Sequence, residues 1–245
     1  MPRLLTYNVH RCVGTDGHLD VGRVAAVIAA LAPDVVALQE LDVGRARTGH
    51  VHQAETLARR LGMSFHFHAA LHVEAERYGD AILTALPVRL IKAGPLPGHA
   101  GLGWLEPRGA LWVAVEVDGF ELQVINTHLG LVPREQRDQA KALVGPEWLG
   151  APGRRDPAML VGDFNAIPLA LAYRTLSAAL TEARRRSPGD GRVPTFPSRA
   201  PILAIDHVFV SPGVAVTAVG TPRDPLSRRA SDHLPLVVDF QLHRP

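Results

Sequence analysis

The feature that most constrains the fold is a hairpin pattern in the middle of the chain. Two apolar-rich runs, residues 110–117 and 120–127, flank the dipeptide Asp118-Gly119. An Asp-Gly pair between alternating apolar runs is a strong signature of a tight β-hairpin, because the turn needs backbone conformations that these two residues tolerate. The chain therefore forms at least one pair of antiparallel strands.

Helical and strand-like patterns are mixed along the rest of the chain. Asp20 is predicted to cap a helix with Val21, Val24, Ile28 and Leu31 at helical spacing, which ends at Pro33. The same approach predicts a helix at 53–61 closed by Gly62, further helices at 133–149 and 168–180, and loops at 93–108 and 187–201. Strands are predicted at 4–9, 64–70, 81–84, 205–210 and 234–240, and the short apolar runs 35–38 and 159–161 are typical of strands buried on both faces.

The number and mixture of these elements predict the fold class. No internal repeat or change of composition divides the sequence, so we expect a single domain over residues 1–245. With 47% hydrophobic residues, a chain of this length can bury a sizeable core. The strands are too many for one small sheet, and hairpins occur beside helix crossovers. We therefore expect an α/β sandwich, in which two mixed β-sheets pack face to face with helices outside.

Composition excludes several classes of protein. The single cysteine, Cys12, rules out an internal disulfide and a cysteine-rich zinc site. A net charge of +2 gives no electrostatic footprint for nucleic acid, and only Lys92 and Lys141 among the 26 basic residues are lysines. No stretch approaches the ~18 apolar residues of a membrane span, and no secretory signal is visible. We therefore expect a cytoplasmic globular protein that acts as a monomer.

Polar residues repeatedly follow the predicted buried strands. Each of these places has a structural alternative, because asparagine and aspartate are common in turns and caps. Six such places in one chain are hard to explain as turns, and strand ends in a sheet sandwich gather at one rim. We therefore expect a single pocket formed by Asn8, Glu40, Asn126-Thr127-His128, Asp163 with Asn165, Asp206-His207 and Asp232-His233.

The side chains at these places are carboxylates, carboxamides and imidazoles, without a thiolate. Oxygen donors of this kind suit Mg²⁺ or Mn²⁺ and are poor ligands for structural zinc. Histidine adds acid–base capacity near neutral pH. A hard metal ion beside an acid–base imidazole is the equipment for attack of water on a phosphate ester.

Six short motifs occur in the order TYNVH, QE, NTHL, GDFN, IDH and SDH. They resemble the endonuclease/exonuclease/phosphatase superfamily, which has the fold of deoxyribonuclease I, and the resemblance runs from Leu4 to Phe240. It implies a four-layer α/β sandwich, in agreement with the sheets expected above. The chain departs from commoner bacterial relatives at Asp80, Thr84 and Ala85, where they often have Asn, Ser and Arg, and this weakens the case for a substrate contact there.

The resemblance implies a set of metal ligands. Glu40 is expected to be the principal ligand, with Asn8 beside it. Asp163 and Asn165 are expected to position the attacking water and the scissile phosphate, around one or two ions. Asp232 completes the expected set, and the expected ion is Mg²⁺, with Mn²⁺ as a substitute.

The resemblance also implies catalytic roles. His233 matches the general base of the nuclease and sphingomyelinase branches, oriented by Asp232, while Asp206 supports the histidine network. Asp163 is the alternative base. His128 is expected to donate to the phosphate oxygens or to protonate the leaving group, and Arg108 resembles a phosphate-contacting arginine.

The leading functional hypothesis is an Mg²⁺-dependent hydrolase of a small or lipid-derived phosphodiester. The first alternative is a nuclease acting on DNA or RNA. The near-neutral net charge disfavours this hypothesis, and so does the low content of aromatic residues, which make up 5% of the chain and are scattered along it. The second alternative is a catalytically silent binding protein with the same fold, which is disfavoured because every chemical residue of the six motifs is present. Two lysines also argue against an inositol phosphatase with a lysine-rich pocket.

Two further groups of basic residues attract attention. The run Arg184–Arg186 leads into a proline-rich loop through Thr195–Pro197, and we expect this segment to border the pocket and select a head group. His66, His68 and His72 alternate along a predicted strand, which favours a solvent-exposed face.

Overall fold

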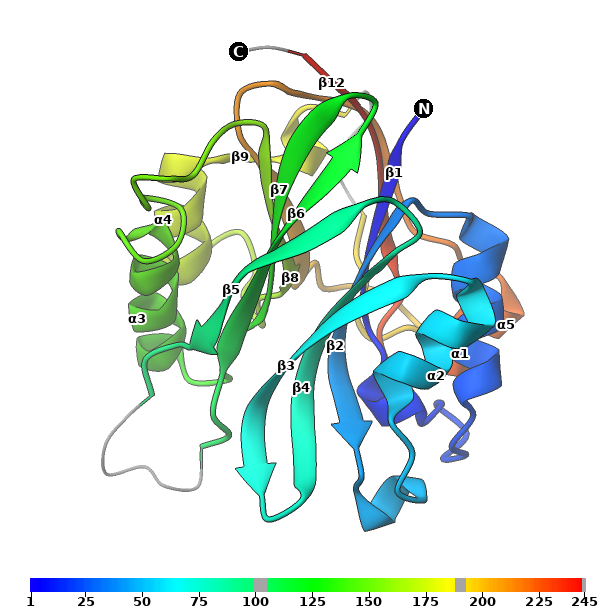
Figure 1. Cartoon of the computed structure of the whole chain (residues 1–245). Coiled ribbons are helices and arrows are strands. Elements are labelled where there is room, and N and C mark those ends of the chain that lie inside the picture. Colours follow the sequence, from blue (N-terminus) through cyan, green and yellow to red (C-terminus); the bar gives the residue numbers. More distant parts are fainter. Residues whose placement is uncertain (99–104, 188–192, 244–245) are drawn as a thin grey trace.

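Two six-stranded β-sheets pack face to face, and helices cover both outer faces (Figure 1). The computed structural model describes residues 1–98, 105–187 and 193–243. Three hydrophobic cores separate the layers: one between the sheets, one between the first sheet and its helices, and one between the second sheet and its helices. The expected four-layer α/β sandwich is therefore confirmed.

The first sheet has the strand order β11-β12-β1-β2-β4-β3. β1 pairs in parallel with β2, and all other neighbours are antiparallel. Its strands are β1 (Arg3–Asn8), β2 (Val35–Val43), β3 (Ser64–Val73), β4 (Glu76–Thr84), β11 (Val214–Gly220) and β12 (Leu236–Leu242).

The second sheet has the order β5-β6-β7-β8-β10-β9, with β7 and β8 parallel. The hairpin predicted at Asp118-Gly119 joins β6 to β7, and both turn residues have the positive φ, 49° and 80°, that a tight hairpin turn requires. The strands are β5 (Val88–Pro95), β6 (Gly109–Val117), β7 (Phe120–His128), β8 (Ala158–Asp163), β9 (Thr181–Glu182) and β10 (Asp206–Val210).

Helices α1, α2 and α5 lie beside the first sheet, and α3 and α4 beside the second (Figure 1). Asp20 caps α1 as predicted, accepting from the backbone N–H of Arg23 at 2.9 Å. None of the helices in the described residues is long and apolar enough to cross a membrane. The helices are α1 (Val21–Leu31), α2 (Gln53–Leu61), α3 (Pro133–Val144), α4 (Leu171–Ala179) and α5 (Pro225–Ala230), with short 3-10 segments η1 (His10–Cys12), η2 (Ala46–Thr48) and η3 (Ala183–Arg185).

The central strands read as continuous apolar runs because both of their faces are buried. In β1, Leu4 enters the core between the sheets and Leu5 enters the core against α1 and α2. In β2, Val35 enters the core between the sheets and Val36 enters the core against the helices. Each strand therefore supplies two cores, which fixes its position in the middle of the sandwich.

Asn126 joins the two sheets rather than lining the expected pocket. Its amide Nδ2, on β7, donates to the carbonyl oxygens of Leu38 and Ala81 in the first sheet, both at 2.9 Å. Its Oδ1 accepts from Gln39 Nε2 at 2.7 Å. The side chain is fully buried, so these bonds satisfy polar groups that have no access to water.

Several predicted boundaries were wrong. The helix predicted at 133–149 ends at Val144, because Gly145 leaves the helical conformation, and the helix predicted at 168–180 begins at Leu171. The predicted loop 93–108 begins with the end of β5, and its residues 99–104 lie outside the described residues. Strands β5 and β11 and helix α5 were missed, since β5 and β11 are partly exposed and lack a continuous apolar run.

Substitution of Asn126 by leucine should destabilise the fold by about 2–4 kcal/mol, because it removes three hydrogen bonds between buried groups of the two sheets. Urea unfolding followed by circular dichroism measures the change. Gln241→Leu, at an exposed position of β12, is the control and should stay within about 0.5 kcal/mol of the wild type. Equal stabilities for the two variants would contradict the bridging role.

Candidate active site

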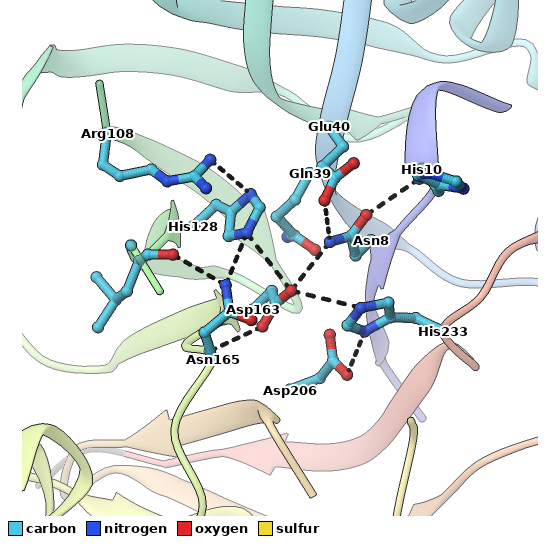
Figure 2. Close-up of polar contacts among 12 residues, drawn as sticks. Asn8, His10, Gln39, Glu40, Arg108, His128, Asp163, Asn165, Asp206 and His233 are labelled. Carbon is cyan, nitrogen blue, oxygen red and sulfur yellow. Dashed lines mark hydrogen bonds and ion pairs between the residues drawn. The ribbon is translucent and has the colours of Figure 1, made fainter. Parts of the chain in front are cut away.

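The candidate site lies where the two parallel strand pairs end (Figure 2). β1 ends at Asn8 and β2 carries Glu40, while β7 and β8 end at His128 and Asp163. The Asn8 amide Nδ2 donates to Glu40 Oε1 and to Asp163 Oδ2, both at 2.9 Å, and its Oδ1 accepts from the backbone N–H of His10 at 3.0 Å. One side chain therefore connects carboxylates that belong to different sheets.

Glu40 reaches the site through a β-bulge. The pairing of β2 with β4 shifts between Leu38 and Leu41, and Glu40 has a φ of 62°. In a regular strand Glu40 would point to the same side as Leu38, which packs against the helices. The backbone N–H of Glu40 is bonded to the carboxyl group of Asp80, whose pKa burial raises to about 8. Asp80 therefore supports the bulge beneath the site.

Asp163 and Asn165 are presented by a turn that requires glycine. Gly162 has a φ of 144°, and a Cβ at this position would collide with the carbonyl oxygen of Thr127 on the neighbouring strand. Asn165 has a left-handed φ of 48°, and its backbone N–H donates to Asp163 Oδ1 at 2.8 Å. Left-handed residues in the bulge of β2 and directly after β8 indicate backbone strain at this site.

A buried carboxylate–histidine–carboxylate group forms the floor of the site. His233 Nδ1 lies 2.9 Å from Asp206 Oδ2, and His233 Nε2 lies 3.6 Å from Asp163 Oδ2 (Figure 2). Burial lowers the pKa of His233, but Asp206 and Asp163 outweigh this effect and raise it to about 10. Burial also raises the pKa of Asp163, against the opposing influence of His233. The protonation of His233 and that of Asp163 therefore depend on each other.

Asp206 is itself held by residues that sequence analysis did not place in this role. The Thr195 hydroxyl donates to Asp206 Oδ2, the oxygen that also bonds His233. Arg184 Nη2 donates to the backbone carbonyl oxygen of Asp206 at 2.9 Å, while its Nη1 pairs with the buried Glu182 at 2.6 Å. Only the proline-rich composition around Thr195 marked this loop in the sequence, and composition alone does not reveal a hydrogen bond to Asp206.

The prediction that Asp232 orients the His233 ring was wrong. Asp232 does not bond the His233 ring among the described contacts; its Oδ1 accepts from the Ser231 hydroxyl at 3.2 Å and lies 3.9 Å from His10 Nδ1. The chain turns between residues 232 and 233, so adjacent side chains diverge, and Asp206 takes the orienting position. Asp232 still faces the pocket.

His128 lies between Arg108 and the Asp163 turn. Its Nδ1 is 3.2 Å from Arg108 Nη1, and its Nε2 is 3.0 Å from the Asn165 amide and 3.5 Å from Asp163 Oδ2. A guanidinium group and an amide NH2 group both donate, so a neutral ring can accept from only one of them. Burial lowers the pKa of His128 well below its usual range, with a further contribution from Arg108. His128 is therefore a neutral ring with one N–H, held between Arg108 and Asn165.

These residues surround a pocket of about 680 Å³. Seven of the nine residues expected to bind metal, take part in catalysis or contact the phosphate line it, while Asn8 and Asp206 lie buried behind them. The lining also includes His10, Arg11 and Phe196, and three residues that sequence analysis did not select, Arg45, Arg47 and Glu106. The expected residues in the lining are Glu40, Arg108, His128, Asp163, Asn165, Asp232 and His233.

Other expected pocket residues lie elsewhere. The Thr127 hydroxyl donates to the Gly109 carbonyl oxygen at 2.9 Å, and His207 is buried with its Nε2 2.8 Å from the Ala166 carbonyl oxygen. Both belong to the packing of the second sheet rather than to the pocket, because strand alternation turns them away from it.

The arginine run 184–186 does not border the pocket, as Arg184 is buried against Glu182 and Arg185 lies 5.9 Å over the ring of Tyr173. The loop that follows does reach the pocket through Phe196, while residues 188–192 lie outside the described residues.

The predicted solvent-exposed face of β3 is only partly confirmed. His72 is exposed, but the Nε2 of His68 is buried and lies close to Gly109 of the second sheet. Burial lowers the pKa of His68. This ring fills space between the sheets that only glycine on β6 leaves open.

The donor set fits a hard metal ion. Asp163, Asp206 and His233 form a buried group whose ligand atoms lie within 4.8 Å of one another and could hold an ion. Glu40 lies on the opposite side of Asp163, bridged to it by Asn8. Carboxylate and amide oxygens outnumber nitrogen donors at this point, which suits Mg²⁺ or Mn²⁺ better than zinc.

Comparison with known proteins agrees with this geometry. Residues 5–233 match the Endonuclease/Exonuclease/phosphatase family. The Escherichia coli K12 protein YbhP is 24% identical over 98% of this chain and 96% of its own length. The structure of an endonuclease/exonuclease/phosphatase from Beutenbergia cavernae is similar with a TM-score of 0.78 and 27% identity, over 98% of this chain and 71% of that chain.

A mannosyl-6-phosphatase from Bacteroides thetaiotaomicron shares the fold, with a TM-score of 0.78 and 19% identity over 99% of this chain and all of that one (100%). The family match covers nearly the whole sequence and includes every strand that contributes to the site. The chain therefore belongs to the endonuclease/exonuclease/phosphatase family, whose members are metal-dependent hydrolases of phosphoester bonds.

Proposed function

We propose that the protein is an Mg²⁺-dependent hydrolase that cleaves a phosphodiester bond by attack of water on phosphorus. The observation that carries this proposal is the Asn8 amide, which holds Glu40 of one sheet and Asp163 of the other at 2.9 Å each. Two carboxylates brought together in a pocket, with His233 at 3.6 Å from one of them, combine metal ligands with acid–base capacity.

Glu40 would be the principal ligand of the ion, with Asn8 beside it and Asp163, Asn165 and Asp232 completing the set. A bound divalent ion would polarise a phosphoryl oxygen and lower the pKa of water. Mn²⁺ should replace Mg²⁺, because both are hard ions that prefer oxygen ligands.

The chain's own residues supply the remaining functions. Two groups would take the proton from the attacking water, Asp163 and His233. Asp206 orients the His233 ring at 2.9 Å, and because the pKa of His233 is raised to about 10, this ring must lose its own proton before it acts as a base. The neutral His128 would donate its ring N–H to a phosphoryl oxygen. Arg108 would contribute positive charge to the same phosphate, and Asn165 would position it.

The proposed substrate is a small or lipid-derived phosphodiester. The pocket of about 680 Å³ is of the size of a small-molecule site, and the net charge of +2 supplies no extended cationic track. A nuclease acting on DNA or RNA is the alternative with the same chemistry, and a catalytically silent binding protein is the alternative without it.

Cleavage of bis-p-nitrophenyl phosphate should require a divalent ion. EDTA should abolish the release of p-nitrophenolate, and Mg²⁺ or Mn²⁺ should restore it. Glu40→Gln should weaken Mg²⁺ binding in calorimetry and lower turnover by orders of magnitude, because an amide is a poorer ligand than a carboxylate. Full activity of this variant would contradict the assignment of Glu40 as the principal metal ligand. If the wild type cleaves no phosphoester at all, the catalytically silent binding protein is favoured instead.

His233→Ala should lower kcat on the same substrate roughly 10²–10⁴-fold, the usual range for a general acid–base group. Asp206→Asn should lower kcat less than His233→Ala does, but more than Asp232→Asn does. The reason is that Asp206 bonds the His233 ring and Asp232 bonds Ser231. Wild-type activity in His233→Ala would move the base to Asp163. A larger loss in Asp232→Asn than in Asp206→Asn would contradict the orienting role of Asp206.

A small phosphodiester should be cleaved better than plasmid DNA at near-physiological salt. Duplex binding needs several cationic contacts along the phosphate backbone, and a net charge of +2 does not favour an extended track of this kind. Agarose-gel nicking assays beside the chromogenic assay measure the preference. Asp163→Ala is the control for contaminating nuclease. Efficient nicking by the wild type that Asp163→Ala abolishes would establish the nuclease alternative.

A further inference from the structure

The pocket extends from the proposed scissile-phosphate position toward a second group of cations. Arg45 and Arg47 lie in and beside η2, directly after β2, and both line the same pocket as Arg108 and His128. Glu106 and Tyr78 lie in the lining as well. Arg45, Arg47, Glu106 and Tyr78 have no role in the proposed cleavage.

Both guanidinium groups are held in place from behind by carboxylates. Arg47 Nε and Nη2 donate to the fully buried Asp42 at 2.7 Å each, and the Arg47 side chain remains 39% exposed. Arg45 donates through Nε to Glu76 at 3.2 Å. Within the described part of the chain, Nη1 of Arg47 and both terminal nitrogens of Arg45 make no hydrogen bond, so they remain available as donors.

Glu106 connects this group to the proposed phosphate position. Its Oε1 is buried without a hydrogen-bond partner and lies 3.6 Å from Arg108 Nη1. Burial raises the pKa of Glu106, and the positive charges of Arg108, Arg47 and Arg45 oppose this effect. Arg47 also lies 5.5 Å over the ring of Tyr78. Arg45, Arg47 and Arg108 therefore line the pocket together with one carboxylate, Glu106.

We propose that Arg45 and Arg47 form a subsite for a second anionic group of the substrate, a phosphate or a carboxylate separate from the scissile phosphate. This inference rests on the proposed phosphodiesterase function and names its substrate class. Guanidinium forks oriented by carboxylates bind oxyanions with two parallel hydrogen bonds and lose little side-chain entropy on doing so. The scarcity of lysine in the sequence therefore does not leave the pocket without anion-binding groups.

Matched substrate pairs test the subsite and separate the two sources of charge. Glycerophosphoinositol and its 4-phosphate differ by one phosphate, and glycerophosphoethanolamine and glycerophosphoserine differ by one carboxylate. For the preferred pair, the wild type should show a kcat/KM about tenfold higher on the more anionic member, mainly through KM, which corresponds to one good charge-assisted contact. Glycerophosphocholine serves as the cationic comparison.

Arg45→Gln and Arg47→Lys should each reduce this preference to less than about threefold. Lysine at 47 keeps a positive charge beside the buried Asp42 and removes only the fork, so the fold is retained. Arg89→Gln is the matched control, because Arg89 pairs with Glu121 at 2.8 Å on an exposed part of β5 and should keep the full preference. Circular dichroism checks that all variants are folded.

Calorimetry in EDTA keeps the inference testable without turnover. The wild type should bind the more anionic member of the preferred pair more tightly, and Arg45→Gln should lose the difference. Cleavage of bis-p-nitrophenyl phosphate with no preference within either pair, in turnover or binding, would overturn the subsite and leave the proposed function intact. Anion-selective binding without any turnover would support the subsite and overturn the proposed function. Preference for glycerophosphocholine would assign this end of the pocket to cations around Glu106.

Discussion

The two hydrogen bonds of the Asn8 amide are the contact on which the site depends. They connect the end of β1 to a carboxylate from each sheet, at a point where, among the described residues, no backbone hydrogen bond joins the sheets. Because the backbone N–H of His10 holds the amide oxygen, the orientation of the amide is fixed by the main chain. The distance between the sheets at this edge is therefore set by the same side chain that sets the distance between the proposed ligands.

Much of the framework can be predicted from sequence because each central strand fills two cores. The runs 35–38 and 159–161 are apolar at every position for this reason, and the Asp118-Gly119 hairpin is a local signal that needs no tertiary information. Edge strands such as β5 and β11 are partly exposed and carry weaker patterns. The six polar motifs were recognisable because each lies within or beside a strand of the buried kind.

The parts of the site that could not be predicted depend on contacts between distant segments. Nothing in the sequence near Thr195 reveals that its hydroxyl meets Asp206, because the loop that carries it returns to the site only in the folded chain. Asp232 shows the opposite case. It is next to His233 in the sequence, which suggested that it orients the His233 ring, but in the structure it bonds Ser231. Asn126 has the same chemistry as Asn8 and lies on the same face of β7 as His128, yet two residues farther from the strand end it is buried between the sheets.

The bulge in β2 makes the site depend on the number of residues between Leu38 and Leu41. Both leucines pack against the helices, so a chain shorter by one codon at Glu40 would restore an even ladder with β4 and keep both apolar contacts. It would lose only the carboxylate that β2 contributes to the pocket. A sandwich of this kind can therefore gain or lose a pocket carboxylate by a single in-frame insertion or deletion, while the sequence of its core stays as it is.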